Sequence, residues 1–394
     1  MNFSSLVSNS GLFCDGDWIE KKDQDPNGSV RLIQLADIGV CEFKNKSSRY
    51  ITEEKGATLN CTYLEKGDIL IARLPEPLGR CCIFPLEGRY ITAVDIAVVR
   101  IRRTDVSTKY IMYMINSPQF RAEIKKYESG TTRKRISRKN LDKIQFNLPS
   151  LPEQERIVTR IEELFSELDN GVETLKKTKE QLAVYRQAVL NHEFSACGSE
   201  VPLKSVCKHI TDGDHMPPPK SPSGIPFIMI SNIYNHKINW TNTSFVGREY
   251  FDNIDTKRKP QKGDVLYTVT GSFGIPVLVS FDKEFCFQRH IALLRPDSSI
   301  LQKYLFYVLQ TSRVYNQASE KSTGTAQKTV ALSVLREMTI PYIEDKEIQD
   351  KIVTSVQNKL SICDSVEQTV NDALQQAEAM RQSILKKSFE GGLQ

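Results

Sequence analysis

The sequence is poor in the features that mark membrane proteins and disulfide-rich secreted proteins. No apolar run approaches the roughly 20 residues that a membrane-spanning helix needs. The first residues, MNFSSLVSNSG, lack the basic start and apolar middle of a signal peptide. The nine cysteines are an odd number, and no two of them form a CxxC pair. We therefore expect a cytoplasmic protein with reduced thiols, without a disulfide framework or a zinc site.

The sequence also lacks the motifs of nucleotide-dependent and base-modifying enzymes. No glycine-rich loop ends in GK[ST] and no GxGxxG run follows an apolar strand, so ATP and dinucleotide binding are not indicated. The Asn/Asp-Pro-Pro-Tyr/Phe motif of DNA amino-methyltransferases is absent, and we interpret Met216-Pro217-Pro218-Pro219-Lys220 as a rigid extended loop. No metal-ligand spacing relates the five histidines, which are His192, His209, His215, His236 and His290. We expect no catalytic residues, no metal and no cofactor in this chain.

What the sequence does contain is the composition of a globular protein with an uneven distribution of charge. Its 394 residues, 40% hydrophobic and 26% charged, indicate two or three domains. The net charge is +6 over residues 1–150, −3 over 151–196, +5 over 197–341 and −3 over 342–394. Basic globular segments that alternate with acidic ones favour a polyanion as the partner of the former and protein as the partner of the latter.

One stretch, Leu151 to Phe194, has the spacing of a long helix and recurs about 195 residues later. Its apolar residues step by three and four, which predicts a helix over about 153–193 that is roughly 60 Å long. The run IVTRIEELFSELDNGVETL from Ile157 aligns with IVTSVQNKLSICDSVEQTV from Ile352. The residues expected to pack helix against helix are Ile157, Ile161, Leu164, Leu168, Leu175, Leu182, Tyr185 and Val189 in the first copy, and Ile352, Val356, Cys363, Val370, Met380 and Ile384 in the second.

Two structures suit such helices: a core helix of an ordinary bundle, or an antiparallel coiled-coil spacer. Each copy follows about 150 residues of different composition, and both keep the same register. Two helices of equal length that share one heptad register and lie 195 residues apart fit the core of an ordinary bundle poorly. We therefore favour the spacer.

The repeat continues outside the helices. Asp15-Gly16-Asp17-Trp18 aligns with Asp212-Gly213-Asp214-His215, Lys66-Gly67-Asp68 with Lys262-Gly263-Asp264, and Gly130-Thr131 with Gly324-Thr325. These matches predict one unit of about 195 residues, duplicated. Within a unit, short apolar runs between turn residues indicate strands, for example at 30–38, 68–73, 81–85 and 91–101. Helices are expected at 109–116 and 119–127, and at 302–310 and 314–321.

The end of the first globular segment carries a more specific pattern. Gly130-Thr131 is followed by Ile136, Leu141 and then Leu148-Pro149-Ser150-Leu151-Pro152-Glu153-Gln154, which opens the long helix. This pattern resembles the specificity subunits of type I restriction-modification systems. In the second copy, three extra residues separate Ile340-Pro341-Tyr342-Ile343 from Glu347-Ile348-Gln349, and the Glu-Gln pair is lost.

The resemblance implies an α/β (α+β) fold with an internal pseudo-two-fold repeat. Two mixed, β-rich target-recognition domains, at 1–150 and 197–341, would be separated by two long antiparallel coiled-coil helices. The central conserved spacer helix would occupy 151–196 and the C-terminal one 342–394. It also implies a non-catalytic subunit whose two domains each read one half of a bipartite double-stranded DNA target.

By the same resemblance, the helices set the spacer and dock two modification (methyltransferase) subunits. Those subunits would bind S-adenosylmethionine and methylate adenine at N6, and restriction subunits would be further partners. Two other classes remain open: a bifunctional restriction-methylation enzyme, for whose methyltransferase motifs the length leaves no room, and a coiled-coil scaffold that binds without sequence preference.

Contact with DNA requires cations for phosphates and rigidly held polar side chains for base edges. The loops that follow the Lys-Gly-Asp strands, at 75–80 and 271–274, differ between the copies although their framework aligns. Different loops on one framework would read different bases. The expected DNA-binding residues are Arg73, Arg80, Arg133, Lys134, Arg135, Arg138 and Lys139 in the first domain, and Lys257, Arg258, Lys259, Ser272, Arg289 and Lys328 in the second.

Overall fold

The computed structural model describes residues 1–7, 10–75, 77–195, 198–215, 217–324 and 327–390. The expected boundary between 196 and 197, Met216 of the proline run and Thr325 of the second Gly-Thr pair lie outside the described residues. Contacts divide the chain into two units, one made of Met1–Leu175 with Asp372–Gln394 and the other of Lys176–Asn371. Each unit thus contains one globular domain and part of each long helix.

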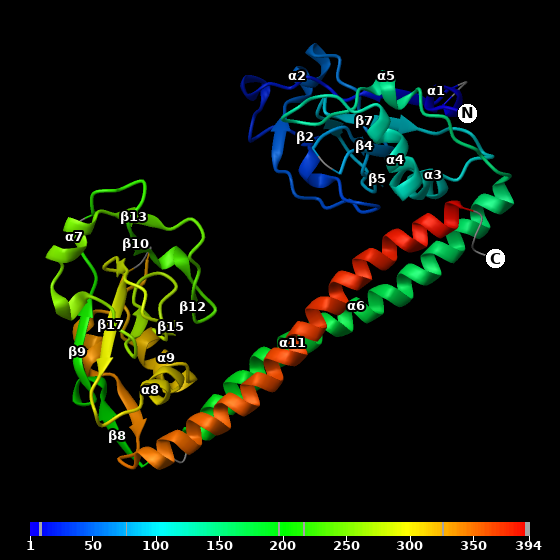
Figure 1. The fold of residues 1–394 in the computed structure, drawn as a ribbon. Coiled ribbons are helices and arrows are strands. Elements are labelled where there is room, and N and C mark those ends of the chain that lie inside the picture. The colour runs from blue at the N-terminus through cyan, green and yellow to red at the C-terminus, as the bar shows by residue number, and fades with distance from the viewer. Residues whose placement is uncertain (8–9, 76, 196–197, 216, 325–326, 391–394) are drawn as a thin grey trace. The chain divides into compact units, whose positions relative to one another are not determined.

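The first globular domain contains two small sheets (Figure 1). The larger sheet is antiparallel and has the strand order β1 (Leu12–Asp15), β7 (Ile96–Arg100), β4 (Ile69–Ala72) and β5 (Cys81–Ile83). The smaller sheet has the order β3 (Arg49–Ile51), β2 (Val30–Ile33) and β6 (Tyr90–Thr92). The helices of this domain are α1 (Phe3–Leu6), α2 (Glu53–Thr58), α3 (Thr108–Asn116), α4 (Pro118–Lys126) and α5 (Arg138–Leu141), with 3-10 turns at Lys21–Asp23 and Leu35–Asp37.

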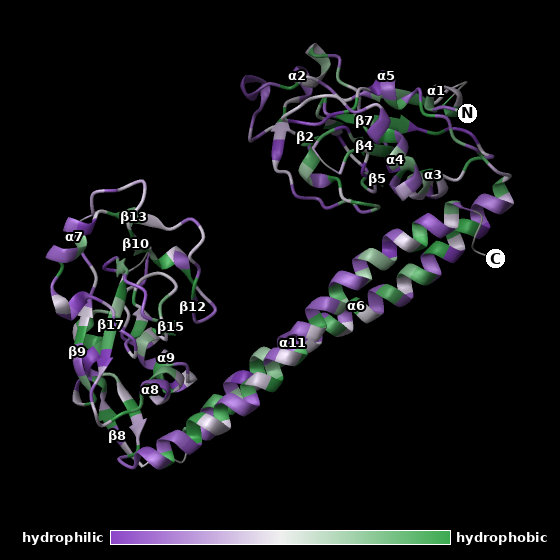
Figure 2. Ribbon diagram, viewed as in Figure 1, coloured by the Kyte–Doolittle hydropathy of each residue, from purple (hydrophilic) through white to green (hydrophobic). Residues whose placement is uncertain are grey.

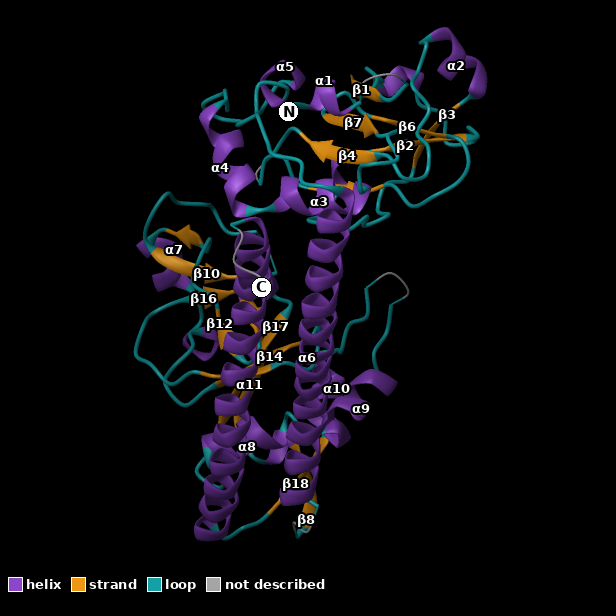
Figure 3. Cartoon of the chain, turned by 90° about the vertical axis from the view of Figure 1, so that its right-hand side faces the viewer, coloured by secondary structure: helices purple, strands orange, loops and turns teal. Residues whose placement is uncertain are grey.

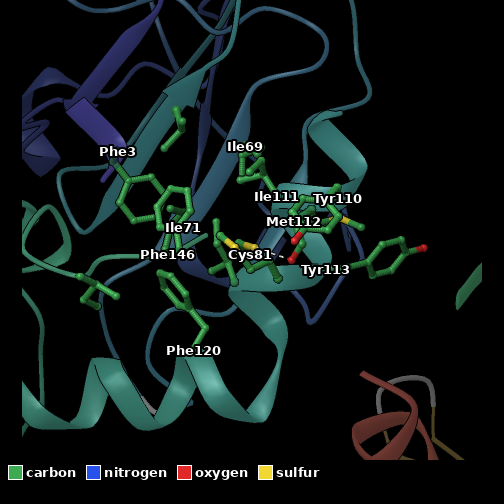
Figure 4. Packing of buried hydrophobic residues seen from close by; sticks show 14 of the residues in the cluster. Phe3, Ile69, Ile71, Cys81, Tyr110, Ile111, Met112, Tyr113, Phe120 and Phe146 are labelled. Atoms are coloured by element: carbon green, nitrogen blue, oxygen red, sulfur yellow. Dashed lines mark hydrogen bonds between the residues drawn. The ribbon is translucent and has the colours of Figure 1, made fainter. Parts of the chain in front are cut away.

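Strand β4 shows why its sequence is apolar without interruption. Ile69 and Ile71 point into one buried cluster together with residues of α3 and α4, while Leu70 and Ala72 point into another on the opposite face. Because side chains alternate along a strand, a sheet that is covered on both faces requires such a run. Figure 4 shows the first cluster, in which the rings of Phe3 and Phe120 gather near Ile71.

The second domain repeats this plan strand for strand. Its larger sheet has the order β15 (Pro276–Leu278), β14 (Val265–Thr268), β17 (Ile291–Pro296) and β9 (Cys207–Asp212), and its smaller sheet has β13 (Ser244–Val246), β10 (Ile225–Ile228) and β16 (Cys286–Phe287). Its helices are α7 (Arg248–Asn253), α8 (Gln302–Val308), α9 (Ser312–Glu320) and α10 (Leu332–Glu337), with 3-10 turns at Leu203–Ser205, Ile230–Asn232 and Thr256–Arg258. Two strand pairs are additional: β8 (Ser199–Pro202) with β18 (Thr339–Tyr342), and β11 (Ile233–Tyr234) with β12 (Lys237–Ile238).

The two Lys-Gly-Asp turns fold alike because each aspartate is buried against an arginine. Asp68 accepts two hydrogen bonds of 2.8 Å from Arg100, and Asp264 accepts bonds of 2.9 and 2.8 Å from Arg295. A bidentate pair of this kind fixes geometry as well as supplying energy. The pair holds the start of the central strand β4 or β14 to the end of its neighbour β7 or β17.

The two long helices are α6 (Leu151–Glu193) and α11 (Lys346–Phe389), of 43 and 44 residues. In the first unit Ile161 of α6 shares a buried cluster with Ile384 of α11, and in the second unit Leu190 shares one with Val353. Within each unit the segments of the two helices therefore lie side by side and run antiparallel (Figures 1 and 3). Figure 2 shows the alternation of apolar and polar residues along both helices. Among the described residues, no helix combines the length and the apolar character needed to cross a membrane.

We call the line of residues at which α6 and α11 pack together the seam. The structure corrects two of the positions that were expected to lie in it. Most of the named residues are buried or half-buried, but Tyr185 is 52% exposed and Met380 is 54% exposed. The next residues, Arg186 and Arg381, take their places in the seam. Steps of three then four and of four then three both satisfy a heptad, so the spacing alone did not decide which residue turns inward.

The seam arginines form matching ion pairs in the two units. In the second unit Arg186 binds Asp364 at 2.6 Å and Glu367 at 2.9 Å. In the first unit Arg381 binds Asp169, and its guanidinium lies 4.9 Å from the ring centroid of Phe165. Arg186 and Arg381 are equivalent in the 195-residue repeat, as are Asp169 and Asp364. The pairing therefore follows the internal pseudo-two-fold repeat.

A buried glutamine fastens each domain to the start of its helix. Gln154 accepts a hydrogen bond of 2.8 Å from the Ser107 N–H and donates to the carbonyls of Asp105 and Pro149. Gln349, 195 residues later, makes the same three bonds to the backbone of residues 301, 299 and 343. Only the glutamate of the Glu-Gln pair is therefore missing from the second copy.

Replacing either glutamine by alanine is expected to destabilise the folded protein by about 2–4 kcal/mol. Gln154→Ala or Gln349→Ala would leave one N–H and two carbonyls without a partner in a buried setting. Chemical denaturation of the full chain measures the loss. Gln181→Ala, at an exposed position of α6, is the control and should change stability by less than about 0.5 kcal/mol. Equal effects at buried and exposed positions would contradict this role.

Candidate nucleic-acid interface

In each domain the loops that carry most of the expected DNA contacts meet at one edge of the larger sheet. Asp15 pairs with Ala97 and Ala72 pairs with Ile96, so the ends of β1 and β4 and the start of β7 lie together. In the second domain Asp212 pairs with Ala292 and Thr268 with Ile291, which brings together the ends of β9 and β14 and the start of β17. We call this end of each sheet the loop edge.

A hairpin joins the loop edge in both domains. Ser129 and Arg135 exchange backbone hydrogen bonds of 2.9 and 2.8 Å, and Thr323 and Thr329 do the same. Gly130 and Gly324 adopt φ values of +96° and +107°. A Cβ there would lie 2.3 or 2.4 Å from the carbonyl oxygen three residues on, so only glycine fits. The matched glycines, Gly130 and Gly324, therefore occupy backbone positions that require glycine.

Two of the arginines expected to bind DNA serve the domain itself. Arg73 donates to the carbonyl of Val94 and pairs with Asp15 at 3.3 Å, with only 14% of its side chain exposed. Arg80 donates to three carbonyls, those of Ile38, Pro75 and Leu35. Burial lowers the pKa of Arg80. The donors of these two residues therefore hold the loop in shape, and their contact with DNA stays a prediction.

The other cations of the first domain that were expected to bind DNA are exposed at the hairpin and at α5. Among the described residues, no ion pair or side-chain hydrogen bond engages the charges of Arg133, Arg135 or Lys139. Lys134 pairs with Glu128 at 2.7 Å. Arg138 reaches Asp15 at 3.3 Å, and its guanidinium lies 5.5 Å from the ring centroid of Phe13. Within the described part of the chain, the first loop edge thus offers three unpaired cations to an anion.

Of three neighbouring cations that were expected to bind DNA in the second domain, two lie at or beside the loop edge and one packs elsewhere in the domain. Arg258 approaches Asp212 at 3.6 Å, so it lies at the loop edge, and neighbouring Lys257 is exposed. Lys259 instead donates to the carbonyl of Asp252, and its ammonium lies 4.9 Å from the ring centroid of Phe251. Asp15 and Asp212 are thus each held by arginine, although the arginines come from different segments.

Ser272 and Lys328 are exposed on two segments that touch. The Gly271 N–H donates to the Lys328 carbonyl at 2.8 Å, and the Ser272 carbonyl accepts from Thr268 Oγ1 at 2.8 Å. Both side chains are available at the loop edge because these bonds use only their backbone. This pair of segments matches the loop and hairpin of the first domain.

Arg289 is exposed at the rim of a cavity of about 400 Å³. Polar side chains and an apolar wall line this cavity. Among them are His215, Lys220, Gln288, His290, Phe227 and Val246. Burial lowers the pKa of His290, which favours its neutral form. Apart from Arg289, these polar residues were not among the expected contacts, although Gln288 and His290 flank it in sequence.

The comparison with known families agrees with this duplicated arrangement. A model described as the type I restriction modification DNA specificity domain matches residues 15–182 and again residues 200–376. The chain belongs to this family. The expected family and the expected fold class are both confirmed.

Several named proteins are similar to this chain in sequence. The EcoBI specificity subunit of Escherichia coli is 25% identical over 306 residues, which are 70% of this chain and 64% of that protein. The EcoKI specificity subunit of Escherichia coli strain K12 is 24% identical over 309 residues, 72% of this chain and 65% of that protein. The chain therefore spans less than two thirds of the length of these relatives.

A solved structure shares the fold of the whole chain. A chain from work described as "Structural basis underlying complex assembly and conformational transition of the type I R-M system" is 18% identical and superposes with a TM-score of 0.69. The match covers 98% of this chain and 99% of that one. Within the part of this chain that the structure describes, no three His, Cys, Asp or Glu side chains are grouped to hold a metal.

The carboxyl group of Asp17, at the loop edge of the first specificity domain, titrates abnormally. Burial raises its pKa from 3.8 to about 6, although the Thr62 N–H that it accepts at 3.1 Å acts in the opposite direction. A raised pKa in the folded state stabilises the protein below pH 3.8, and this stabilisation is lost as the pH rises through about 6.

Asp17→Asn is therefore expected to melt at a higher temperature than the wild type above pH 6. The advantage should shrink as the pH falls towards 4, because the wild-type carboxyl group is then neutral in the folded protein and only partly ionised in the unfolded chain. Thermal unfolding of both proteins between pH 4 and pH 8 measures the difference. Asp282→Asn, which removes an exposed carboxylate of the second domain, is the control. A pH-independent difference for Asp17→Asn would contradict the assignment.

Proposed function

We propose that this chain is the DNA sequence-specificity subunit of a type I restriction-modification complex. It is non-catalytic, and each domain reads one half of a bipartite double-stranded DNA target. The observation that carries the proposal is one duplicated framework whose two loop edges present different side chains. Membership of the specificity family supports the same conclusion.

The first loop edge suits the phosphate backbone of a duplex. Phosphate contact needs cations that are not neutralised by the protein, and Arg133, Arg135 and Lys139 meet this condition among the described residues. Lys257, Arg289 and Lys328 are exposed in the second domain and would serve the other half-site. Base reading would fall to polar side chains on rigid backbone, such as Gln288 and Arg289.

The helices are the natural site for partner subunits. Within the second unit, large apolar side chains are exposed on both helices: Val184 (71%) and Tyr185 (52%) on α6, and Ile362 (64%) on α11. Met380 on α11 is 54% exposed in the first unit. Exposed apolar side chains clustered on a helix surface favour contact with protein. We propose that two modification (methyltransferase) subunits, which would carry S-adenosylmethionine, dock on the helices, and that restriction subunits are further partners.

In this proposal the chain is organised as target-recognition domains at 1–150 and 197–341 and spacer helices at 151–196 and 342–394, and it acts in the cytoplasm. The 43 residues of α6 correspond to about 65 Å of helix. We propose that this length sets the spacer between the half-sites.

Methylome mapping tests the function directly. Host DNA is sequenced for modified adenine with this chain present together with its modification subunits, and with this chain deleted. The expected result is one bipartite motif, two short half-sites with an unspecified spacer, that is modified only when the chain is present. Unchanged modification after deletion would overturn the proposal.

Adding one heptad to both α6 and α11 should lengthen the spacer of that motif by about three base pairs. Seven residues add about 10 Å of helix and return the seam to register, while the two reading domains stay unchanged. The same mapping measures the result. Seven residues inserted between β12 and β13 serve as the control. A changed half-site with an unchanged spacer would contradict the proposal that helix length sets the spacer.

Removing the three free cations of the first domain should weaken binding to every duplex and flatten its salt dependence. For Arg133→Ala, Arg135→Ala and Lys139→Ala combined, the slope of log K against log salt should fall by up to about 3. Titrations of the assembled complex at several salt concentrations measure it.

A matched triple variant controls for the change in net charge. Lys66→Ala, Lys126→Ala and Arg160→Ala remove three exposed cations that already pair with Glu87, Glu123 and Glu163. Its slope should match the wild type. If both triple variants have the same slope, the hairpin and α5 do not contact phosphate.

A further inference from the structure

Trp18 is the most exposed aromatic side chain of the first domain, with 70% of its surface accessible. The second tryptophan, Trp240, is partly buried and packs against Phe281 and Phe285 at ring-centroid distances of 5.5 and 5.7 Å. The indole N–H of Trp18 lies 3.4 Å from Glu20, which is a long and weak contact. A large apolar side chain that its own domain leaves in water suits an external partner.

The backbone that leads to Trp18 is fixed against the loop edge. The Gly16 N–H donates to the Ile96 carbonyl at 2.8 Å, and the Asp17 N–H donates to the Thr92 carbonyl at 2.7 Å. A Cβ on Gly16 would lie 2.2 Å from the Ala93 carbonyl oxygen, so the two segments touch closely. The exposed ring is therefore presented by rigid backbone, next to the turn at 93–96.

The second domain places another ring at the same point of the repeat. His215 aligns with Trp18, and 59% of its side chain is exposed. The chain before it packs just as closely, because a Cβ on Gly213 would lie 2.1 Å from the Phe287 carbonyl oxygen. His215 lines the same cavity as Gln288 and Arg289. An aromatic ring beside the turn that precedes β7 or β17 is thus common to both domains.

We propose that Trp18 packs its indole against the bases of the half-site read by the first domain, and that His215 occupies the matching place in the second. This inference rests on the proposed function, which it deepens by naming a base-contacting residue. In a duplex the base faces are stacked on one another, so the indole would contact apolar base edges in a groove, such as the C5-methyl group of thymine. Trp18 lies at the loop edge, where the free cations gather, and not on the helices, where the exposed apolar side chains favour a protein partner.

Trp18→Ala should raise the Kd for the bipartite duplex by about 5- to 100-fold, because the indole would no longer be removed from water on binding. The salt slope should stay unchanged, because the lost contact is apolar. Trp18→Phe, which keeps a ring, should recover most of the affinity. Binding is measured with the assembled complex, on the duplex found by methylome mapping and on one with the first half-site scrambled. For the scrambled duplex, the wild type and Trp18→Ala should bind alike.

A spectroscopic readout observes Trp18 in the chain that carries the native residue. The full chain is produced with 5-hydroxytryptophan, whose emission can be excited selectively, and assembled with unlabelled partner subunits. Trp18→Phe identifies the signal of position 18. The expected result is quenching of that signal by the bipartite duplex and not by the scrambled one.

The outcomes separate the two proposals. If the complex binds no duplex with sequence preference, the proposed function fails. If it binds the bipartite duplex while Trp18→Ala has an unchanged Kd and the label is not quenched, only the role of Trp18 fails. If partner subunits alone quench the label, Trp18 contacts protein and the inference is likewise overturned.

Discussion

Everything about this chain depends on how firmly a β-rich domain is joined to a long helix. In each half of the chain, the side-chain amide of one glutamine connects the domain to the helix. Gln154 and Gln349 have no exposed surface, and each uses its carbonyl oxygen and both amide hydrogens on the backbone of the preceding domain. A buried amide with all of these groups satisfied is stable only in one arrangement of its neighbours. The direction in which the helix leaves the domain is therefore part of the folded core.

The helix pair adds a second constraint, which is register. Arg186 and Arg381 occupy seam positions that apolar residues would otherwise fill. Each is half-buried and pairs its guanidinium with an aspartate of the facing helix. Polar residues in a seam reduce stability but exclude shifted pairings, because a slip of one heptad would leave the charges without partners. Since the two ion pairs are equivalent in the repeat, each unit has an ion pair that disfavours a shifted register.

The sequence predicted the parts of this structure that depend on local pattern. Strands such as β4 and helices such as α3 and α4 appear within a few residues of their expected positions, because apolar runs and turn residues act over short distances. The duplication was equally visible, since it is a property of the sequence itself.

The sequence did not decide between two roles of the same residue, or between two neighbouring residues that suit the same position. Arg73 and Arg80 have the composition of DNA contacts, but their donors face carbonyls that only the folded loop brings near. Tyr185 and Arg186 fit the heptad equally well, and the choice depends on an aspartate in a helix about 180 residues away. Trp18 was overlooked because exposure cannot be read from a single aromatic residue in a loop.

The comparison of the two loop edges explains how one framework could serve two different half-sites. The turns Ala93-Val94-Asp95 and Gln288-Arg289-His290 share no side chain, yet Ala93 and Gln288 donate equivalent bonds to the carbonyls of Ile33 and Ile228, both at 3.0 Å. Each turn then closes with a bond from the N–H of Ile96 or Ile291. Because these bonds use only backbone atoms, the side chains between them are free to change without a change in fold. The constant elements of the framework, the glycines and the Asp-Arg pairs, are those whose side chains or missing side chains the backbone requires. Under the proposed function, new specificity would need substitutions only on the loop edges, while the buried glutamines and the paired helices stay unchanged.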